Sequence, residues 1–219
     1  MAIASPSDIC NLALIRLGEQ RVINIETDDT ERAIQCNLIY DHTRDEMLRD
    51  LDWNFAISRA RLARLASDPI GSYDYEYQLP VSPFCLRVVN MINDQEVGDI
   101  EHIPSHLQQP NYRIEGGKLL TDEKIVNIRY VSRAADIALY DSLFVECLSL
   151  RLATKLALSL VQSTQLSRSV FTEFLIVRTR AAFRNSGEWM GQPDPTGDRW
   201  IDVARSGAGT RTTKIVLQE

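Results

Sequence analysis

The amino-acid sequence predicts an α+β fold: an α-helical bundle with an inserted small antiparallel β module and an extended C-terminal arm. Apolar residues recur at helical spacing near the start of the chain and again after residue 134. Between these parts the apolar period changes to two, and after residue 187 glycines and prolines interrupt any regular pattern. We therefore divide the chain into N-terminal bundle helices (1–67), the β module (68–133), the long central and fourth helices (134–187) and the arm (188–219).

Two helices are expected in the first segment. Ser5 can cap the first helix, Pro6 suits its first turn, and Gly18 suits the position just past its end. Asp28, Asp29 and Thr30 offer caps for the second helix, where acidic side chains also complement the helix dipole. The apolar faces are Ile9, Leu12, Ala13 and Leu17 in the first helix, and Ala33, Cys36, Tyr40, Met47, Leu48 and Leu51 in the second.

The β module is predicted from alternating patterns. Residues 53–65 fit either a strand or a helix, and the clear alternation begins at residues 73–79. Residues 85–92 form an apolar strand, and the pair Gly116-Gly117 lies between two short alternating runs, which is a strong hairpin signal. A last strand is expected over residues 126–130. The module should therefore contain four or five antiparallel strands.

Two further helices complete the predicted bundle. The helix over about 137–162 is apolar on most of its circumference, so we expect it at the bundle centre. Its narrow polar strip is Ser142, Glu146, Ser149, Lys155, Ser159 and Gln162. The fourth helix, about 166–185, should end at Gly187, with Arg178, Arg180 and Arg184 in its final turns.

Charge and composition exclude several classes of protein. Hydrophobic residues make up 44% and charged residues 25%, as in soluble globular proteins, and the net charge of −6 argues against a general hold on nucleic acid. The charge is unevenly spread: residues 1–67 hold eight basic and eleven acidic side chains, whereas residues 135–187 hold six basic and four acidic. Opposite charges on the two parts can help to stack or pair subunits. We expect four free, buried cysteines in a reducing compartment, no signal peptide and no membrane span.

The sequence offers little catalytic chemistry. It contains no phosphate-binding glycine loop and no nucleophile motif, and we expect no cofactor, no metal and no enzymatic activity. His102 and His106 have a spacing compatible with metal ligation, but they flank a proline in a loop and lack a clear third ligand. The weaker enzyme alternative, an uncharacterised hydrolase, would need these histidines and Asp99 to share a pocket.

Two further features of the sequence offer candidate binding residues. Arg44, Arg49, Arg59, Arg61 and Arg64 form the densest basic run, and a DNA-binding module built on them is the alternative function. The arm is the other feature, because a freely solvated tail rarely carries tryptophans and clustered aliphatic residues. Its candidate residues for contact with a portal or a neighbouring subunit are Trp189, Trp200, Ile201, Ile215, Val216 and Leu217.

A set of motifs in a fixed order resembles one family. Residues 11–19 (NLALIRLGE), followed by Ala33, Asn37 and the run Asp52-Trp53-Asn54-Phe55, resemble the head-to-tail adaptor proteins of short-tailed bacteriophages, the tail tubular protein A type. The middle is similar too, with residues 77–80 (YQLP), 85–88 (CLRV) and the Gly116-Gly117 hairpin. The resemblance covers residues 7–185, and the arm after Gly187 has no counterpart.

The resemblance implies a structural virion protein at the neck of the particle, made in the cytoplasm of the bacterial host. Proteins of this family form a twelve-subunit ring between the portal above and the tail nozzle below. Double-stranded DNA passes through the ring without specific binding, and no membrane, metal or cofactor takes part. We expect the helical bundle to form the ring wall, the β module to face the nozzle or a neighbour, and the arm to dock on the portal or an adjacent subunit.

Overall fold

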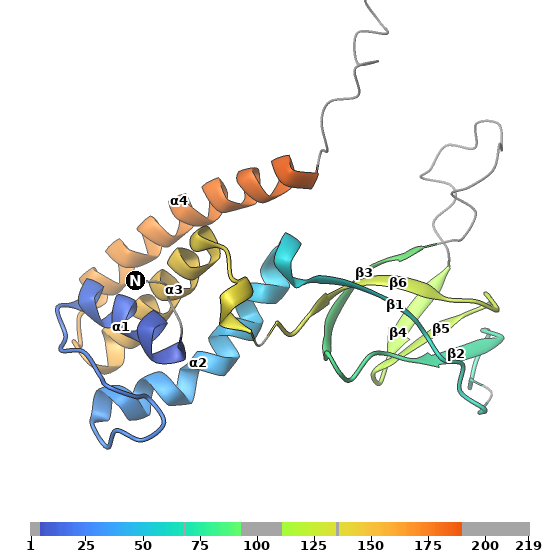
Figure 1. Ribbon diagram of the computed structural model, residues 1–219, viewed down its shortest axis with the longest axis horizontal. Coiled ribbons are helices and arrows are strands. Elements are labelled where there is room, and N and C mark those ends of the chain that lie inside the picture. Colours follow the sequence, from blue (N-terminus) through green and yellow to red (C-terminus); the bar gives the residue numbers. More distant parts are fainter. Residues whose placement is uncertain (1–4, 68, 93–110, 135, 190–219) are drawn as a thin grey trace, which may run out of the picture.

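The computed structural model describes residues 5–67, 69–92, 111–134 and 136–189, and these form a helical lobe and a β lobe (Figure 1). The described part is therefore α+β, with a helical bundle interrupted by an antiparallel β module, as predicted. The elements in chain order are α1 (Pro6–Leu17), α2 (Glu31–Asp50), the 3₁₀ turn η1 (Asn54–Ala56), β1 (Ile57–Arg61), β2 (Tyr75–Gln78), β3 (Cys85–Ile92), β4 (Tyr112–Glu115), β5 (Lys118–Thr121), β6 (Asn127–Ser132), the 3₁₀ turn η4 (Ile137–Leu139), α3 (Ser142–Ser159) and α4 (Thr164–Trp189).

The first two helices begin where their caps predict. The Asp8 backbone N–H donates to Ser5 Oγ at 3.2 Å, and the Ser5 backbone N–H donates to the Asp8 carboxylate at 3.1 Å, which closes a capping box. Gly18 follows α1 in the left-handed conformation, with φ of 74°. Thr30 caps α2 by accepting a hydrogen bond from the Ala33 backbone N–H.

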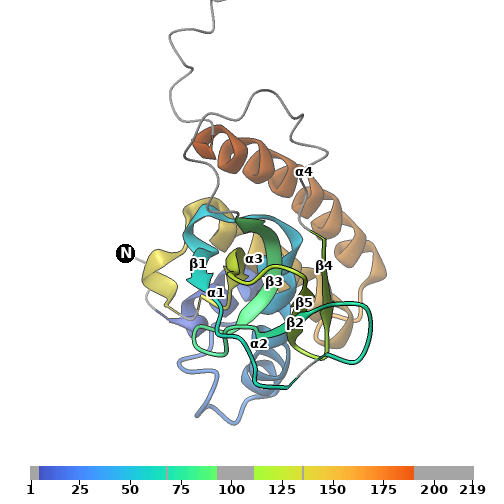
Figure 2. The same cartoon turned by 90° about the vertical axis from the view of Figure 1, so that its right-hand side faces the viewer.

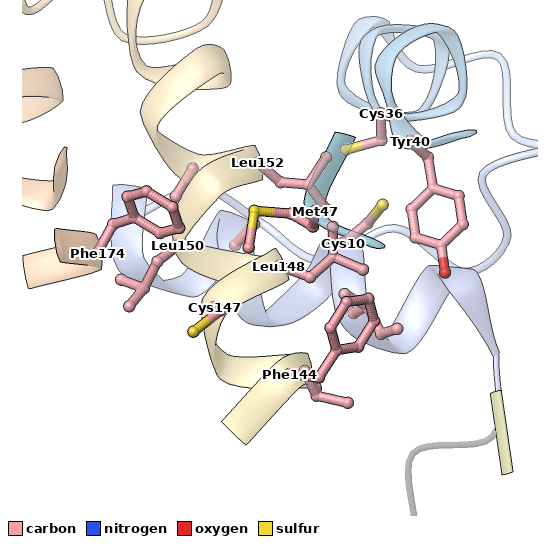
Figure 3. Packing of buried hydrophobic residues seen from close by; sticks show 14 of the residues in the cluster. Cys10, Cys36, Tyr40, Met47, Phe144, Cys147, Leu148, Leu150, Leu152 and Phe174 are labelled. Carbon is pink, nitrogen blue, oxygen red and sulfur yellow. The ribbon is translucent and has the colours of Figure 1, made fainter. Parts of the chain in front are cut away.

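Helix α3 lies at the centre of the bundle, as its apolar circumference predicts. It packs against α1, α2 and α4, and most of its side chains are buried. Figure 3 shows Leu150 on the side of α3 that faces Phe174 of α4, and Leu152 on the side of Met47 of α2. Ser149, expected on the polar strip, is buried instead, and its hydroxyl donates to the Glu146 carbonyl at 2.9 Å.

The bounds of the two later helices differ from the prediction. The side chains of Asp136 and Asp141 each accept a hydrogen bond from the backbone N–H two residues later in the chain. The chain therefore forms the separate turn η4 before α3 begins. Helix α4 continues through Gly187, which has no left-handed backbone conformation, and a single helical glycine costs only about 1 kcal/mol. The predicted stop at Gly187 is therefore wrong, and Arg178 lies well before the last turn, where it pairs with Asp50 of α2.

Two three-stranded antiparallel sheets form the β lobe: sheet A in the order β1-β6-β3 and sheet B in the order β2-β5-β4. The described module thus has six strands rather than four or five. The additional strand, β1, comes from the ambiguous stretch 53–65 and pairs with β6, so sheet A begins before the proposed boundary at residue 67. The hairpin β4–β5 turns at Gly116 and Gly117, with φ of 56° and 77°, as predicted from the glycine pair.

An aromatic cluster joins the two lobes. The ring of Phe144 at the start of α3 packs against Trp53 and Phe55, both at 5.0 Å between centroids, and against Tyr140 at 4.8 Å. The buried Trp53 indole donates to the Met47 carbonyl at 2.8 Å, which anchors the end of α2. On sheet A, Val131 belongs to this bundle core, whereas its neighbours on the opposite face belong to a separate core between the sheets.

The cysteines have the free, buried state that the sequence predicts. All four cysteines are free and buried: Cys10, Cys36, Cys85 and Cys147. Burial raises the pKa of the Cys147 thiol to about 12, so this side chain packs as a neutral apolar group. Among the described residues, no helix has the length and apolar character needed to cross a membrane.

Glu46 of α2 ties this helix to α3. Its carboxylate accepts hydrogen bonds from Arg151 Nη2 and Lys155 Nζ, each at 2.6 Å. Burial raises the pKa of Glu46, but the two cations outweigh it and lower the pKa below its ordinary value. A carboxyl group with a lowered folded-state pKa contributes stability above its unfolded pKa and loses that contribution as the pH falls through the folded pKa.

We therefore predict that Glu46→Gln reduces the free energy of unfolding at pH 7 and that this loss shrinks as the pH falls below about 4. Urea denaturation of both proteins across this pH range measures the effect. A difference between the two proteins that stays constant with pH would contradict an ionised Glu46 as the bridging group.

Candidate assembly interface

The structure describes little of the predicted arm. Trp189 is the last residue of α4 rather than part of an irregular arm, because the helix runs past Gly187. The other five arm candidates lie outside the described residues: Trp200, Ile201, Ile215, Val216 and Leu217. His102, His106 and Asp99 of the enzyme alternative also lie outside them. Within the described ranges, no group of three or more His, Cys, Asp or Glu side chains is placed to hold a metal ion.

The predicted basic run does not form one patch. Arg44 of α2 is bound within its own helix, by Asp41 at 2.8 Å and Asp45 at 2.9 Å. Arg64 stacks on the Tyr75 ring of sheet B, with its guanidinium carbon 4.2 Å from the ring centroid. Arg59 and Arg61, in contrast, are exposed on β1. A single DNA-binding surface built from all five arginines is therefore not supported.

An exposed apolar stripe runs along the outer face of α4. Leu175, Ile176 and Phe183 expose 45%, 64% and 76% of their surface. The opposite face of the helix carries the core residues, such as Phe174 and Val177, so Ile176 and Phe183 point away from the bundle, while Leu175 lies at the rim of a groove between α4 and α2. Side chains of this size and exposure at helical spacing make this face a candidate interface.

Arginines surround the α4 stripe. Arg168, Arg180 and Arg184 are exposed, and none of them has an ion-pair partner in the part of the chain that the structure describes. Glu173 on the same helix is paired with Arg16 of α1, which also contacts Glu146 of α3. The α4 stripe is thus an apolar surface with a positive border.

Helix α2 carries a second stripe of the opposite charge. Ile34 and Leu38 expose 55% and 74% of their surface, while the core face of the helix holds Ala33 and Cys36. Glu31 and Asp41 lie one turn before and one turn after the apolar pair, and the Asp41 side chain is 79% exposed. The α2 stripe is therefore an apolar surface whose border carries two carboxylates, of which Asp41 is already paired with Arg44 and Glu31 has no ion-pair partner among the described residues.

The two stripes face away from each other. Helix α3 lies between α2 and α4, and Figures 1 and 2 both show α4 on one side of the bundle and α2 on the other. Each helix buries its inner face against α3, so its outer stripe is directed outward. Complementary patches on opposite sides of a subunit are the geometry of a heterologous, head-to-tail contact.

A groove between α2 and α4 contains both acidic and basic side chains, which general acid–base catalysis would need. These side chains are paired with one another. Its wall includes Glu46, Asp50, Arg151 and Arg178. Both carboxylates are bound by cations of the same wall, and the pKa of Glu46 is lowered. A general acid needs the opposite shift of its pKa, so this groove does not favour the hydrolase alternative.

Sequence reasoning missed both stripes, although the signal was present. The core face predicted for the fourth helix leaves Leu175, Ile176 and Phe183 unassigned. Apolar residues that remain after the core face of a helix is assigned identify a second face. The uneven charge of the segments indicates the sign of the two borders.

The chain was also compared with known proteins. No family model matches it, and no curated protein shows significant similarity to it. Its function is therefore inferred from the geometry of the two stripes and from the resemblance of its motifs.

Proposed function

We propose that this chain is a non-enzymatic structural virion protein, a head-to-tail adaptor whose subunits form a ring between portal and tail nozzle. The observation that carries the proposal is the pair of complementary stripes, an acid-bordered one on α2 and an arginine-bordered one on α4. When α4 of one copy covers α2 of the next, both apolar surfaces are buried and the border charges pair. The resemblance to phage adaptors supports the same assembly.

The type of contact is compatible with a ring. In an isologous dimer the same patch meets itself, which would place the α4 arginines against one another. A heterologous contact leaves one free patch at each end of every open oligomer, so further subunits add; the assembly closes into a ring when the rotation between neighbours permits it and otherwise grows as a filament. The resemblance gives twelve as the number of subunits in the proposed ring, with duplex DNA passing through its centre.

The β lobe supplies a second contact layer in this proposal. It is joined to the bundle through the aromatic cluster of Trp53, Phe55, Tyr140 and Phe144, so it is held at one end of the subunit. A module that projects from the ring wall can contact the next ring of the tail, and we assign it to the nozzle side or to a neighbouring subunit. The proposed site of action is the neck of the virion.

The arm provides the proposed contact with the portal or an adjacent subunit. We predict that a chain ending at Trp189 still forms rings but no longer attaches to portal-bearing heads, because it lacks Trp200, Ile201 and the aliphatic run 215–217. Sedimentation of purified heads with the full-length and the shortened chain measures attachment. Normal attachment of the shortened chain would contradict the role of the arm.

A further inference from the structure

Sheet A presents an arginine-rich face that the bundle covers only in part. Arg59 and Arg61 of β1 lie on the same face as Arg129 of β6, because Arg59 is directly opposite Arg129 in the register of the two strands. Arg87 of β3 is on this face too, since it is opposite Val131. The other face holds Ala60, Ile128 and Tyr130, which pack into the core between the sheets.

The positive charge of this face is poorly compensated within the chain. The strands of sheet A contain these four arginines and no acidic residue, whereas sheet B contains two basic and two acidic residues. Arg87 pairs with Asp52, but Arg59 and Arg61 have no ion-pair partner among the residues that the structure describes. The face therefore carries a net positive charge on a rigid sheet.

The arginines of this face also repel one another. Like charges directly opposite each other destabilise a pair of strands. Burial is the main cause that lowers the pKa of Arg129, and the charge of Arg59 lowers it further, against an opposing effect of Asp52. An anion placed on the sheet would relieve this repulsion.

The side chains of the face fit a phosphate backbone better than a protein. At the bundle end, the apolar residues Ile57, Val89 and Val131 are packed against the bundle core. Beyond them the strand positions of the face present arginine and asparagine together with Ile92, without an aromatic side chain of the kind that anchors a protein interface. Guanidinium groups bind phosphate in a bidentate manner, and phosphate contacts carry no sequence preference.

We propose that Arg59, Arg61 and Arg129 form a binding face for the phosphate backbone of duplex DNA. That this duplex is the one passing through the ring rests on the proposed function, whereas the binding face itself does not. Contacts of this kind bind DNA of any base sequence weakly. The salt dependence of the affinity grows with the number of phosphates that are neutralised.

The test uses the full-length chain and a short duplex of mixed sequence, with binding followed by fluorescence anisotropy over a range of salt concentrations. The double variant Arg59→Gln/Arg61→Gln removes two cations from the face. The matched control, Arg113→Gln/Lys124→Gln, removes two exposed cations elsewhere in the β lobe, and a second variant, Arg59→Lys/Arg61→Lys, retains the charge. Particle mass is measured on the same samples.

The wild type is expected to bind, with an affinity that falls as salt rises. In the Gln variant the slope of log affinity against log salt should become shallower by about 1.8, since each phosphate that is no longer neutralised reduces the slope by about 0.9. The control should keep the wild-type slope, and the Lys variant should stay close to it. Equal slopes in the Gln variant and the control, or no binding by the wild type, would overturn the proposed binding face.

The mass measurement separates this inference from the proposed function. Rings that do not bind DNA contradict the binding face and leave the adaptor proposal intact. A monomer whose DNA binding disappears in the Gln variant supports the binding face and contradicts the adaptor proposal.

Discussion

Two variants of this chain, Ile176→Asp on α4 and Leu38→Asp on α2, are each expected to remain monomeric, while their equimolar mixture forms a dimer and nothing larger. Each variant loses one of the two complementary stripes and keeps the other. In the mixture, only the intact α4 stripe of one variant can meet the intact α2 stripe of the other, which gives one good interface per pair. Native mass spectrometry or light scattering after gel filtration measures the masses.

The expected loss is large because the aspartate would be buried without a partner in the assembled interface. Such a buried charge costs about 3–5 kcal/mol, which corresponds to roughly 10²- to 4 × 10³-fold in the dissociation constant of each contact. Ile125→Asp is the matched control, since Ile125 is 52% exposed in the β lobe and away from both stripes. Its assembly should equal that of the wild type.

Other results of the mixing experiment identify other interfaces. Dimers formed by Leu38→Asp alone would show that α4 meets α4 in an isologous contact. Assembly of both single variants like the wild type would show that neither stripe is the interface, and it would contradict the proposed head-to-tail contact.

The second large effect concerns the joint between the lobes. Phe144→Ala is expected to lower the free energy of unfolding by about 3–5 kcal/mol, because it empties a fully buried position and removes the packing of this ring on its aromatic neighbours. Chemical denaturation of the unassembled chain, followed by circular dichroism, measures the change. Phe84→Ala is the control: its ring is 45% exposed and stacks on Arg133, so the expected loss is about 1 kcal/mol.

A small effect of Phe144→Ala, comparable to that of the control, would show that the aromatic cluster does not hold the lobes together. A loss confined to one of two separate transitions would show that the lobes unfold independently. The structure predicts neither result, because residues of sheet A and of the helices belong to one continuous core.

Local signals make much of the fold predictable. The capping residues Ser5 and Thr30 determine helix starts through hydrogen bonds within a few residues, and the pair Gly116-Gly117 determines its hairpin through positive φ angles. The strand Cys85–Ile92 has the ends that the sequence predicts, because an apolar run rich in Val, Leu and Ile is a local property of the sequence.

Features that depend on distant residues are not predictable in the same way. The stretch around Ile57 becomes a strand because it pairs with β6, and the paired residues Ile57 and Val131 are far apart in the chain. The alternating pattern of residues 73–79 places Glu76 on the solvent-facing side of its strand. In the fold, Glu76 is buried and paired with Lys118 at 3.0 Å. Tertiary pairing decides both positions.

The charge of the candidate interface can be predicted from the sequence, but its position on the surface cannot. The charge difference between the N-terminal segment and the later helices is a property of composition, and it agrees with the acidic and basic borders. Which side chains remain uncovered depends on the packing of α2 and α4 around α3, and Phe183 illustrates this. Its exposure of 76% becomes evident only when the core face of α4 is known.

The most direct test of the adaptor proposal is electron microscopy of the purified full-length chain mixed with purified portal protein, with negative-stain class averages. We predict a closed ring of twelve subunits stacked on the portal, with the β lobes projecting from one rim. A stable compact monomer that does not bind the portal would contradict the proposed function.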